Sequence, residues 1–205
     1  MKIGCAVLAG GQSSRMGKDK SLLTFQGETF LNKICETLSG FEEKIIASGA
    51  NRTIGVSEVS GTSEISGAYD KNNISNGSWN IVPDIYPKKG PIGGLHAVLS
   101  ICESEALFCV SCDMPLLQKS LVEYVCSFMI EEYDAIIAVT EEGRKQPLCA
   151  IYRKSVVSIL EKQILEGNYR MMGALEQMRV NYVAIGSEYS WQLKNINTPE
   201  EYLEL

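Results

Sequence analysis

The chain has 205 residues, of which 45% are hydrophobic and 21% charged, and its formal net charge is −6 at pH 7. This length suits one folded domain with a full core, which we place over residues 1–205, and the composition excludes a disordered or fibrous protein. The acidic balance argues against wholesale binding to nucleic acid or anionic membranes, because such binding needs an excess of Lys and Arg. Any phosphate chemistry must therefore rely on a local cluster of cations.

The first predicted element is the apolar run IGCAVLA (3–9), which is followed by Gly10 and Gly11 and then by Arg15 and Lys20. Glycine lets the backbone approach a ligand closely, so a glycine pair after a strand can aim N–H groups at phosphate. Arg15 and Lys20 can then neutralise the phosphate charge. A turn with solvated basic side chains is the alternative. Because the run lacks a cleavage region, we interpret it as a strand rather than a signal peptide.

Counting residues excludes two familiar phosphate loops. The dinucleotide pattern G-x-G-x-x-G is absent, because Gly10 and Gly11 are adjacent and the next glycine is Gly17. The Walker pattern needs four residues between its glycines and a Ser or Thr after its lysine. Here five residues separate Gly11 from Gly17, and Asp19 follows Lys18. The loop is therefore of a third kind.

Predicted helices and further strands alternate along the rest of the chain. Helical spacing of apolar residues occurs at 28–38, 93–103 and 120–130, and strand-like apolar runs occur at 44–48, 80–84, 106–112, 135–140, 148–153 and 180–186. Continuously apolar strands interleaved with helices predict a Rossmann-like, three-layer α/β/α fold with a mostly parallel sheet. Ligands bind beyond the carboxyl ends of such strands. We therefore expect the loops 9–20 and 112–116 to lie at the site.

Two features lie on either side of the predicted strand 80–84. Residues 53–79 are rich in Ser, Gly and Asn and are predicted to form a surface excursion, with a linker between two domains as the alternative. Beyond them, Asp84 precedes the segment GPIGG (90–94). The carboxylate could accept hydrogen bonds from a nucleoside, and the glycines would allow its close approach. Ordinary turn formation is the alternative for both.

The seven cysteines are an odd number, and most lie inside apolar runs. This pattern favours free, buried thiols in a cytoplasmic protein over a disulfide framework. Cys109 and Cys112 have C-x-x-C spacing, but the chain offers no second such pair, and His96 is its single histidine. We therefore expect these cysteines to pack in the core rather than to bind metal.

Asp113 directly follows the strand-like run 106–112, so it places a carboxylate at the carboxyl edge of the predicted sheet. Mg2+ prefers oxygen ligands and keeps several waters, so one or two protein carboxylates suffice when phosphate oxygens complete the shell. Capping a following helix is the alternative role for this residue. Near the C-terminus, Thr198 followed by Pro199, with Glu201 at the third helical position, predicts a helix start.

Four stretches, in order and spacing, resemble the molybdenum cofactor guanylyltransferases of the nucleotidyltransferase superfamily. They are LAGGQSSRMGKDKSLL from Leu8, DIYPKKGPIGGLHAVL from Asp84, FCVSCDMPLL from Phe108 and KNINTPEEYLEL from Lys194. The resemblance covers residues 1–205 and is poor only across 53–79. It implies a fold of the nucleotide-diphospho-sugar transferase type. It also implies transfer of GMP from GTP to the terminal phosphate of molybdopterin, or of its molybdenum-loaded form, with release of pyrophosphate.

The resemblance also assigns roles to individual residues. It implies nucleotide binding by Leu8, Ala9, Gly10, Gly11, Lys20, Asp84 and Asp113, catalytic roles for Arg15, Lys20 and Asp113, and Mg2+ binding by Asp113. Some relatives carry an Asn after the second strand, where direct alignment places Gly49, and Asn51 lies close by. The candidates for binding the anionic pterin phosphate are Arg144, Lys145, Arg170, Asn195 and Asn197. Each of these also suits an ordinary surface or turn position.

Several alternatives stay open. A cytidylyltransferase for the same pterin and a sugar-phosphate nucleotidyltransferase keep the fold and change the substrates. The glycine pair after Ala9 favours the guanylyl enzymes, since cytidylyl relatives tend to read Ala-Ala-Gly there. A non-catalytic module could instead bind the cofactor and deliver it to molybdoenzyme apoproteins or other proteins of cofactor biosynthesis. For the enzyme, a phosphate nucleophile is already ionised at neutral pH and needs no general base, which suits a chain with a single histidine.

Overall fold

The computed structural model describes residues 1–10, 21, 23–49 and 79–205. The strands are β1 (Ile3–Leu8), β2 (Thr24–Phe25), β3 (Glu28–Thr29), β4 (Lys44–Ala47), β5 (Asn80–Val82), β6 (Ala106–Ser111), β7 (Ala135–Val139), β8 (Lys145–Arg153) and β9 (Val180–Ala184). The α-helices are α1 (Phe30–Thr37), α2 (Pro91–Ile101), α3 (Lys119–Cys126), α4 (Val157–Leu165), α5 (Met171–Leu175), α6 (Ser187–Ser190) and α7 (Pro199–Leu203), and the 3-10 helices include η3 (Lys154–Val156) and η4 (Trp191–Leu193).

Seven strands form one sheet in the order β5-β4-β1-β6-β8-β7-β9. Six run parallel, and β8 is antiparallel to both of its neighbours. All seven predicted strands are present, so the expected mostly parallel sheet is confirmed. The strand β8 begins at Lys145, three residues before the predicted start at 148. Its pairing with β7 shifts between Ile137 and Ala138, close to Pro147, which has no N–H to donate to a ladder.

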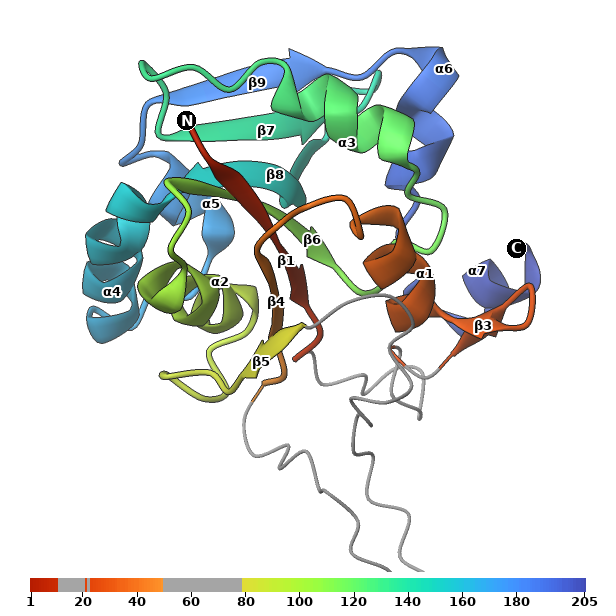
Figure 1. The fold of residues 1–205 in the computed structure, drawn as a ribbon, viewed down its shortest axis with the longest axis horizontal. Coiled ribbons are helices and arrows are strands. Elements are labelled where there is room, and N and C mark those ends of the chain that lie inside the picture. Colours follow the sequence, from red (N-terminus) through yellow and green to blue (C-terminus); the bar gives the residue numbers. More distant parts are fainter. Residues whose placement is uncertain (11–20, 22, 50–78) are drawn as a thin grey trace, which may run out of the picture.

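Helices cover both faces of the sheet (Figure 1). On one face α2, α4 and α5 pack over the buried residues that include Ala6 and Leu8 of β1, and on the other α1 and α3 pack over those that include Cys5 and Val7. Because successive strand side chains point to opposite faces, a strand covered on both sides must be apolar throughout. This explains the uninterrupted apolar runs. Within the described residues, no helix is long and apolar enough to cross a bilayer.

The region before α1 differs from the prediction. The helix expected from residue 28 begins at Phe30, because the Thr29 side chain accepts the Asn32 N–H at 3.2 Å and caps it. Glu28–Thr29 instead pairs with Thr24–Phe25 as a short hairpin. The C-terminal helix α7 lies beside this hairpin in Figure 1, and the Tyr202 hydroxyl donates to the Thr24 carbonyl at 2.7 Å. The predicted start of α7 is confirmed by a complete capping box at Thr198.

The cysteines pack as expected. All seven are free thiols, and six of them are buried, with Cys126 half-buried. Burial raises the pKa of Cys35 to about 12, and it raises the pKa values of Cys126 and Cys149 to about 12 as well. Thiols with such pKa values stay protonated at neutral pH and behave as small apolar side chains. Of the predicted excursion over 53–79, only Trp79 falls within the described residues, and it is buried in the core.

Candidate active site

Four parallel strands end level with one another at the carboxyl edge of the sheet. In the pairing register, Leu8 of β1 lies beside Ala47 of β4 and Ser111 of β6, and Ala47 in turn lies beside Val82 of β5. Two residues beyond these strand ends come Gly10, Gly49, Asp113 and Asp84. Neighbouring strands lie about 4.8 Å apart, so these four positions are gathered on one edge. The two loops expected at the site thus begin side by side, at Gly10 and at Asp113.

The loop that follows β1 and the loop that follows β4 come into backbone contact at Gly10 and Gly49. A Cβ atom added at Gly10 would lie 2.6 Å from the Gly49 Cα, and one added at Gly49 would lie 2.8 Å from the Gly10 Cα. Gly49 also has a φ of +77°, which favours glycine. An Asn side chain at position 49 would therefore bring its Cβ against the Gly10 backbone. Any base contact from this position must come from the backbone.

The backbone donors of the first loop are unequally available. The Ala9 N–H donates to the Ala47 carbonyl at 2.9 Å, and the Leu8 carbonyl accepts the Cys112 N–H at 3.2 Å. Gly10 is exposed at the end of the strand. The Ala9 N–H and the Leu8 carbonyl are thus engaged within the sheet, whereas Gly10 lies at its surface. The others predicted in the loop, Gly11, Arg15 and Lys20, lie outside the described residues, as does Asn51.

Asp84 lies beside two glycines of α2 and has a buried carboxylate oxygen that is unsatisfied among the described residues. Its Oδ1 is buried without a hydrogen-bond partner among the described residues. Cβ atoms added at Gly93 and Gly94 of α2 would lie 3.6 Å from its two carboxylate oxygens. Burial raises the pKa of Asp84, while a hydrogen bond with the Gly49 backbone pulls the pKa the other way. A buried acceptor left without a donor costs free energy, so a donor on a ligand would stabilise it.

Asp113 lies half-buried at the end of β6. The Ser111 hydroxyl donates to its Oδ1, and its carbonyl accepts the Ile196 N–H at 2.9 Å. The alternative role as a helix cap is wrong, because the next helix, α3, has Gln118 as its N-cap residue. The backbone bond to Ile196 brings the segment 195–197 next to this carboxylate. Two regions that are far apart in the sequence thus meet at the end of β6.

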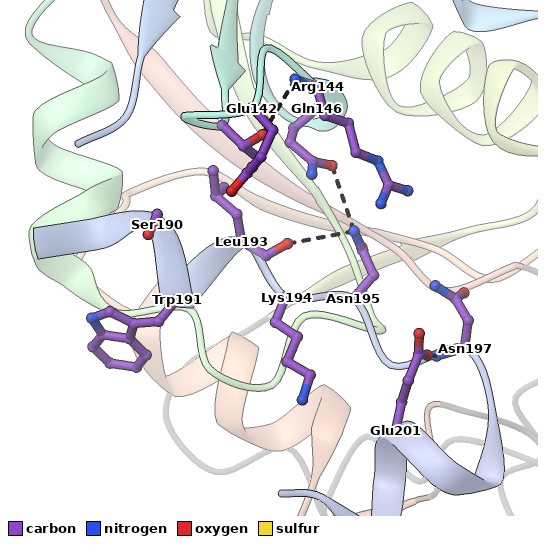
Figure 2. Close-up of a pocket in the computed structure, with 11 residues that line it drawn as sticks. Glu142, Arg144, Gln146, Ser190, Trp191, Leu193, Lys194, Asn195, Asn197 and Glu201 are labelled. Atoms are coloured by element: carbon purple, nitrogen blue, oxygen red, sulfur yellow. Dashed lines mark hydrogen bonds between the residues drawn. The ribbon is translucent and has the colours of Figure 1, made fainter. Parts of the chain in front are cut away.

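A pocket of about 300 Å³ opens beside this junction (Figure 2). It lies between the β7–β8 turn and the segment 190–201, and it is lined by Thr140, Glu142, Arg144, Gln146, Ser190, Trp191, Leu193, Lys194, Asn195, Asn197 and Glu201. Three predicted second-substrate residues, Arg144, Asn195 and Asn197, are therefore brought together. Sequence reasoning missed Gln146, although a polar residue at the start of an apolar strand was a usable signal. Gln146 is buried and accepts a long hydrogen bond of 3.5 Å from the Asn195 side chain.

The other two second-substrate candidates lie elsewhere. The Lys145 Nζ sits 4.3 Å above the ring of Tyr182 on β9, so its side chain does not line the pocket. Successive residues of a strand point to opposite faces, and Lys145 and its neighbour Gln146 do so here. Arg170 is the N-cap residue of α5, and its carbonyl accepts the Gln163 side chain at 2.7 Å. The structure therefore does not unite Lys145 or Arg170 with the pocket residues.

Both signs of charge line the pocket. The Arg144 side chain is exposed, and the turn that carries it is fixed by hydrogen bonds between residues 140 and 144. Lys194 pairs with Glu204 at 3.4 Å. The Glu201 carboxylate accepts the N–H groups of Asn197 and Thr198 and is thereby committed to the capping box. A pocket with an exposed guanidinium and two asparagines suits a polar ligand that carries an anionic group.

The donor set at this edge fits a hard divalent cation shared with a substrate. The described residues contain no group of three or more His, Cys, Asp or Glu side chains that could hold a metal by themselves. Asp113 offers one carboxylate close to the Gly10 end of β1. Mg2+ is commonly held in this way, by one or two carboxylates with substrate phosphates and waters completing six oxygen ligands.

A family model and individual relatives of this chain point to the same protein family. The family model described as "MobA-like NTP transferase domain" matches residues 5–180. A Clostridium perfringens protein named "Probable molybdenum cofactor guanylyltransferase" is 31% identical over 213 residues, which span 100% of this chain and 96% of the relative. An Aquifex aeolicus relative of the same name is 29% identical and spans 96% of this chain and 87% of its own length.

Solved structures agree on the fold. A crystal structure of an Aquifex aeolicus protein is 29% identical and has a TM-score of 0.71, with 95% of this chain and 93% of that chain covered. The crystal structure of the Archaeoglobus fulgidus molybdopterin-guanine dinucleotide biosynthesis protein A has a TM-score of 0.72 at 22% identity, with 100% and 96% covered. The expected nucleotide-diphospho-sugar transferase fold is confirmed. On this sequence match and this fold, the chain belongs to the family of MobA-like NTP transferases.

Proposed function

We propose that this nucleotidyltransferase of molybdenum cofactor biosynthesis transfers GMP from GTP to the terminal phosphate of molybdopterin. A phosphate oxygen of molybdopterin attacks the α-phosphorus of GTP in line. The bond from that phosphorus to the β-phosphate oxygen breaks, and pyrophosphate leaves with the bonding electrons. The product is a guanine dinucleotide cofactor. The observation that supports this most strongly is the level ending of four parallel strands with Gly10, Asp84 and Asp113 just beyond them.

In this proposal the nucleotide lies across the ends of β5, β4, β1 and β6. The Asp84 carboxylate accepts hydrogen bonds from the nucleoside, because its Oδ1 is buried and has no partner among the described residues. Gly10 lets the phosphates approach the backbone. Asp113 would hold Mg2+, which when bound supplies positive charge to the reacting phosphates. Arg15 and Lys20, outside the described residues, are assigned to the phosphate chain on their motif alone.

The second substrate occupies the pocket between the β7–β8 turn and the segment 190–201. Arg144 binds its phosphate, and Asn195 and Asn197 hydrogen-bond to its polar edge. The proposal adds Gln146 behind Asn195 and leaves out Lys145 and Arg170, whose contacts lie away from the pocket. The bond between the Asp113 carbonyl and the Ile196 N–H supports this arrangement, because it joins the two halves at one point. The residues thus act by positioning and by stabilising charge.

A nucleotide panel tests the proposal. The purified chain is incubated with Mg2+, molybdopterin and each of GTP, CTP, ATP and UTP, and pyrophosphate and dinucleotide product are both measured. We expect equal amounts of both products with GTP. Preference for CTP would instead identify the cytidylyl enzyme. Product formation in a parallel incubation, with a sugar phosphate in place of molybdopterin, would identify a sugar-phosphate nucleotidyltransferase. Nucleotide binding without any pyrophosphate would identify a binding or delivery module, and each of these results would overturn the proposal.

A single variant tests the role of the carboxylate. Asp113→Ala should lower the rate of pyrophosphate release by about a hundredfold to a thousandfold, the usual size for the loss of one preorganised electrostatic contact. The fold should persist, because Asp113 is half-buried and contributes its backbone rather than its side chain to the bond with Ile196. Circular dichroism checks the fold. A rate within threefold of the wild type, roughly 0.6 kcal/mol, would reject the assignment of Asp113.

A further inference from the structure

The side chain of Gln192 is a buried polar group outside the pocket lining. It belongs to η4 and is 1% exposed. Its Oε1 accepts the Gln118 N–H at 2.9 Å, and its Nε2 donates to the Ser120 hydroxyl at 3.4 Å. The next residue, Leu193, is buried in the core on the same face of the sheet as Leu121 of α3. A buried amide is costly unless it is satisfied, so this side chain is held in one place.

Gln192 supplies a cap that α3 lacks in its own sequence. The first N–H groups of a helix have no partner within the helix, and an N-cap side chain usually accepts one of them. The N-cap residue of α3, Gln118, makes no such bond with its side chain. An acceptor from 74 residues further along the chain holds the Gln118 backbone instead. The far end of the loop that begins at Asp113 is therefore fixed from η4.

The near end of the same loop is fixed from the same segment. The Asp113 carbonyl accepts the Ile196 N–H at 2.9 Å, four residues after Gln192. The segment 192–197 thus bonds to both ends of the loop 113–118. It also carries Asn195 and Asn197, which line the pocket. These two attachments consequently set the spacing between the Asp113 carboxylate and these two asparagines.

We propose that Gln192 is a positioning residue that sets the distance between the nucleotide half and the second-substrate half of the site. The inference rests on the proposed function in one respect, the assignment of Asp113 to GTP and of the two asparagines to molybdopterin. In-line transfer needs the two substrates aligned, and a displacement of about 1 Å can cost a hundredfold in rate. Gln192 touches neither substrate in this scheme and acts through the loop and the segment that it joins.

The test compares three variants of the full chain. Gln192→Met keeps the length and burial of the side chain but removes both hydrogen bonds. Gln192→Glu keeps the acceptor for the Gln118 N–H, and a negative charge is tolerated at the start of a helix. The matched control is Glu43→Met. The Glu43 carboxylate accepts the N–H groups of Glu103 and Ser104 at 2.7 and 2.8 Å, so it also ties down a distant loop, but at the opposite edge of the sheet.

The first readout is backbone hydrogen exchange without any substrate. We expect Gln192→Met to speed exchange about tenfold in both 112–118 and 193–197, since both hydrogen bonds of the Gln192 side chain are lost at their junction. Gln192→Glu should restore most of the protection of 112–118, and Glu43→Met should leave both segments unchanged. Unchanged exchange in Gln192→Met, or the same increase in Glu43→Met, would overturn the inference. Should Gln192→Met fail to fold, Gln192→Asn shortens the side chain while keeping it polar, and the same criteria apply.

The second readout is kinetic and separates positioning from general destabilisation. In Gln192→Met, kcat should fall about tenfold to a hundredfold, while the affinity for GTP measured without molybdopterin should change less than about threefold. Glu43→Met should change neither. A kcat loss matched by Glu43→Met at equal stability would count against the inference. If the wild-type chain makes no guanine dinucleotide, the proposed function fails, yet the exchange measurements still decide whether Gln192 couples the two segments.

Discussion

The carboxylates at the two edges of the sheet differ in their hydrogen-bond partners and in the direction of their pKa shifts. At the amino edge, before β7, hydrogen bonds from Arg179 lower the pKa of Asp134, with N–O distances of 2.9 to 3.1 Å. Before β4, burial alone would raise the pKa of Glu43, but hydrogen bonds from Ser104 and Glu103 outweigh it and lower the pKa. At the carboxyl edge, burial raises the pKa of Asp84, whose Oδ1 has no partner among the described residues.

This contrast separates stability from function. At the amino edge, carboxylates are satisfied by the protein itself, so they contribute to holding the loops in place. At the carboxyl edge, a carboxylate oxygen remains buried without a partner among the described residues, which costs stability unless a ligand supplies a donor. Substitutions should therefore affect stability alone at the amino edge, and both stability and function at the carboxyl edge.

The largest effect is expected where the two glycine loops touch. Gly49→Asn should lower the free energy of unfolding by about 2–4 kcal/mol, because its Cβ would overlap the Gly10 backbone. Although Asn tolerates a positive φ better than most residues, the overlap is with main chain and cannot be relieved by a rotamer change. Urea unfolding measures the loss, and nucleotide affinity should fall with it. Gly40→Asn is the control, since a Cβ there meets nothing within 4 Å.

At the amino edge, a substitution should change the stability of the protein and leave its activity unchanged. Glu43→Met should lower the free energy of unfolding by about 1–3 kcal/mol, because two backbone N–H groups lose a charged acceptor. The kcat and KM values for both substrates should equal those of the wild type at a temperature where both proteins are folded. Steady-state pyrophosphate release checks this. A specific loss of kcat at full folding would contradict the separation of the two edges.

Asp84→Asn should move stability and function in opposite directions. A carboxylate whose pKa is raised is penalised when it ionises, and the neutral amide avoids this at pH 7. We expect a gain of about 1 kcal/mol, or roughly 2–4 °C in Tm, together with about a tenfold loss in GTP affinity. Differential scanning calorimetry and titration calorimetry measure the two quantities. A variant that loses stability and keeps full GTP affinity would show that Asp84 is an ordinary turn residue.

The smallest expected effect is the pH dependence of the stability changes caused by Glu43→Met and Asp84→Asn. Glu43, with a lowered pKa, contributes stability that is present above its ordinary pKa of 4.5 and is lost as pH falls through the lowered value. Asp84, with a raised pKa, contributes stability that is complete below its ordinary pKa of 3.8 and is lost as pH rises through the raised value. On acidification, therefore, the Glu43→Met penalty and the Asp84→Asn gain should both shrink, by about 1 kcal/mol or less. Tm measured between pH 3 and pH 8, roughly the range that spans these pKa values, tests both signs.

Much of the site follows from local sequence. The apolar runs predict the strands, and parallel strands bring the residues after them to one edge, so the loops that contain Gly10 and Asp113 could be placed together in advance. The capping signal at Thr198 likewise predicts the start of α7. These inferences succeed because each depends on a few consecutive residues and on a general property of parallel sheets.

Other features depend on contacts between distant residues, and only the tertiary structure decides them. Lys145 and Gln146 are equally plausible in the sequence, but the register of β8 sends one to Tyr182 and the other to the pocket. Gln192 caps a helix 74 residues earlier, and Gly49 meets Gly10 across two loops. Sequence by itself determined the strands and the edge at which ligand binding is expected, because apolar periodicity is local. Packing determined which side chains share that edge, because strand register and loop contact arise only when the whole sheet assembles.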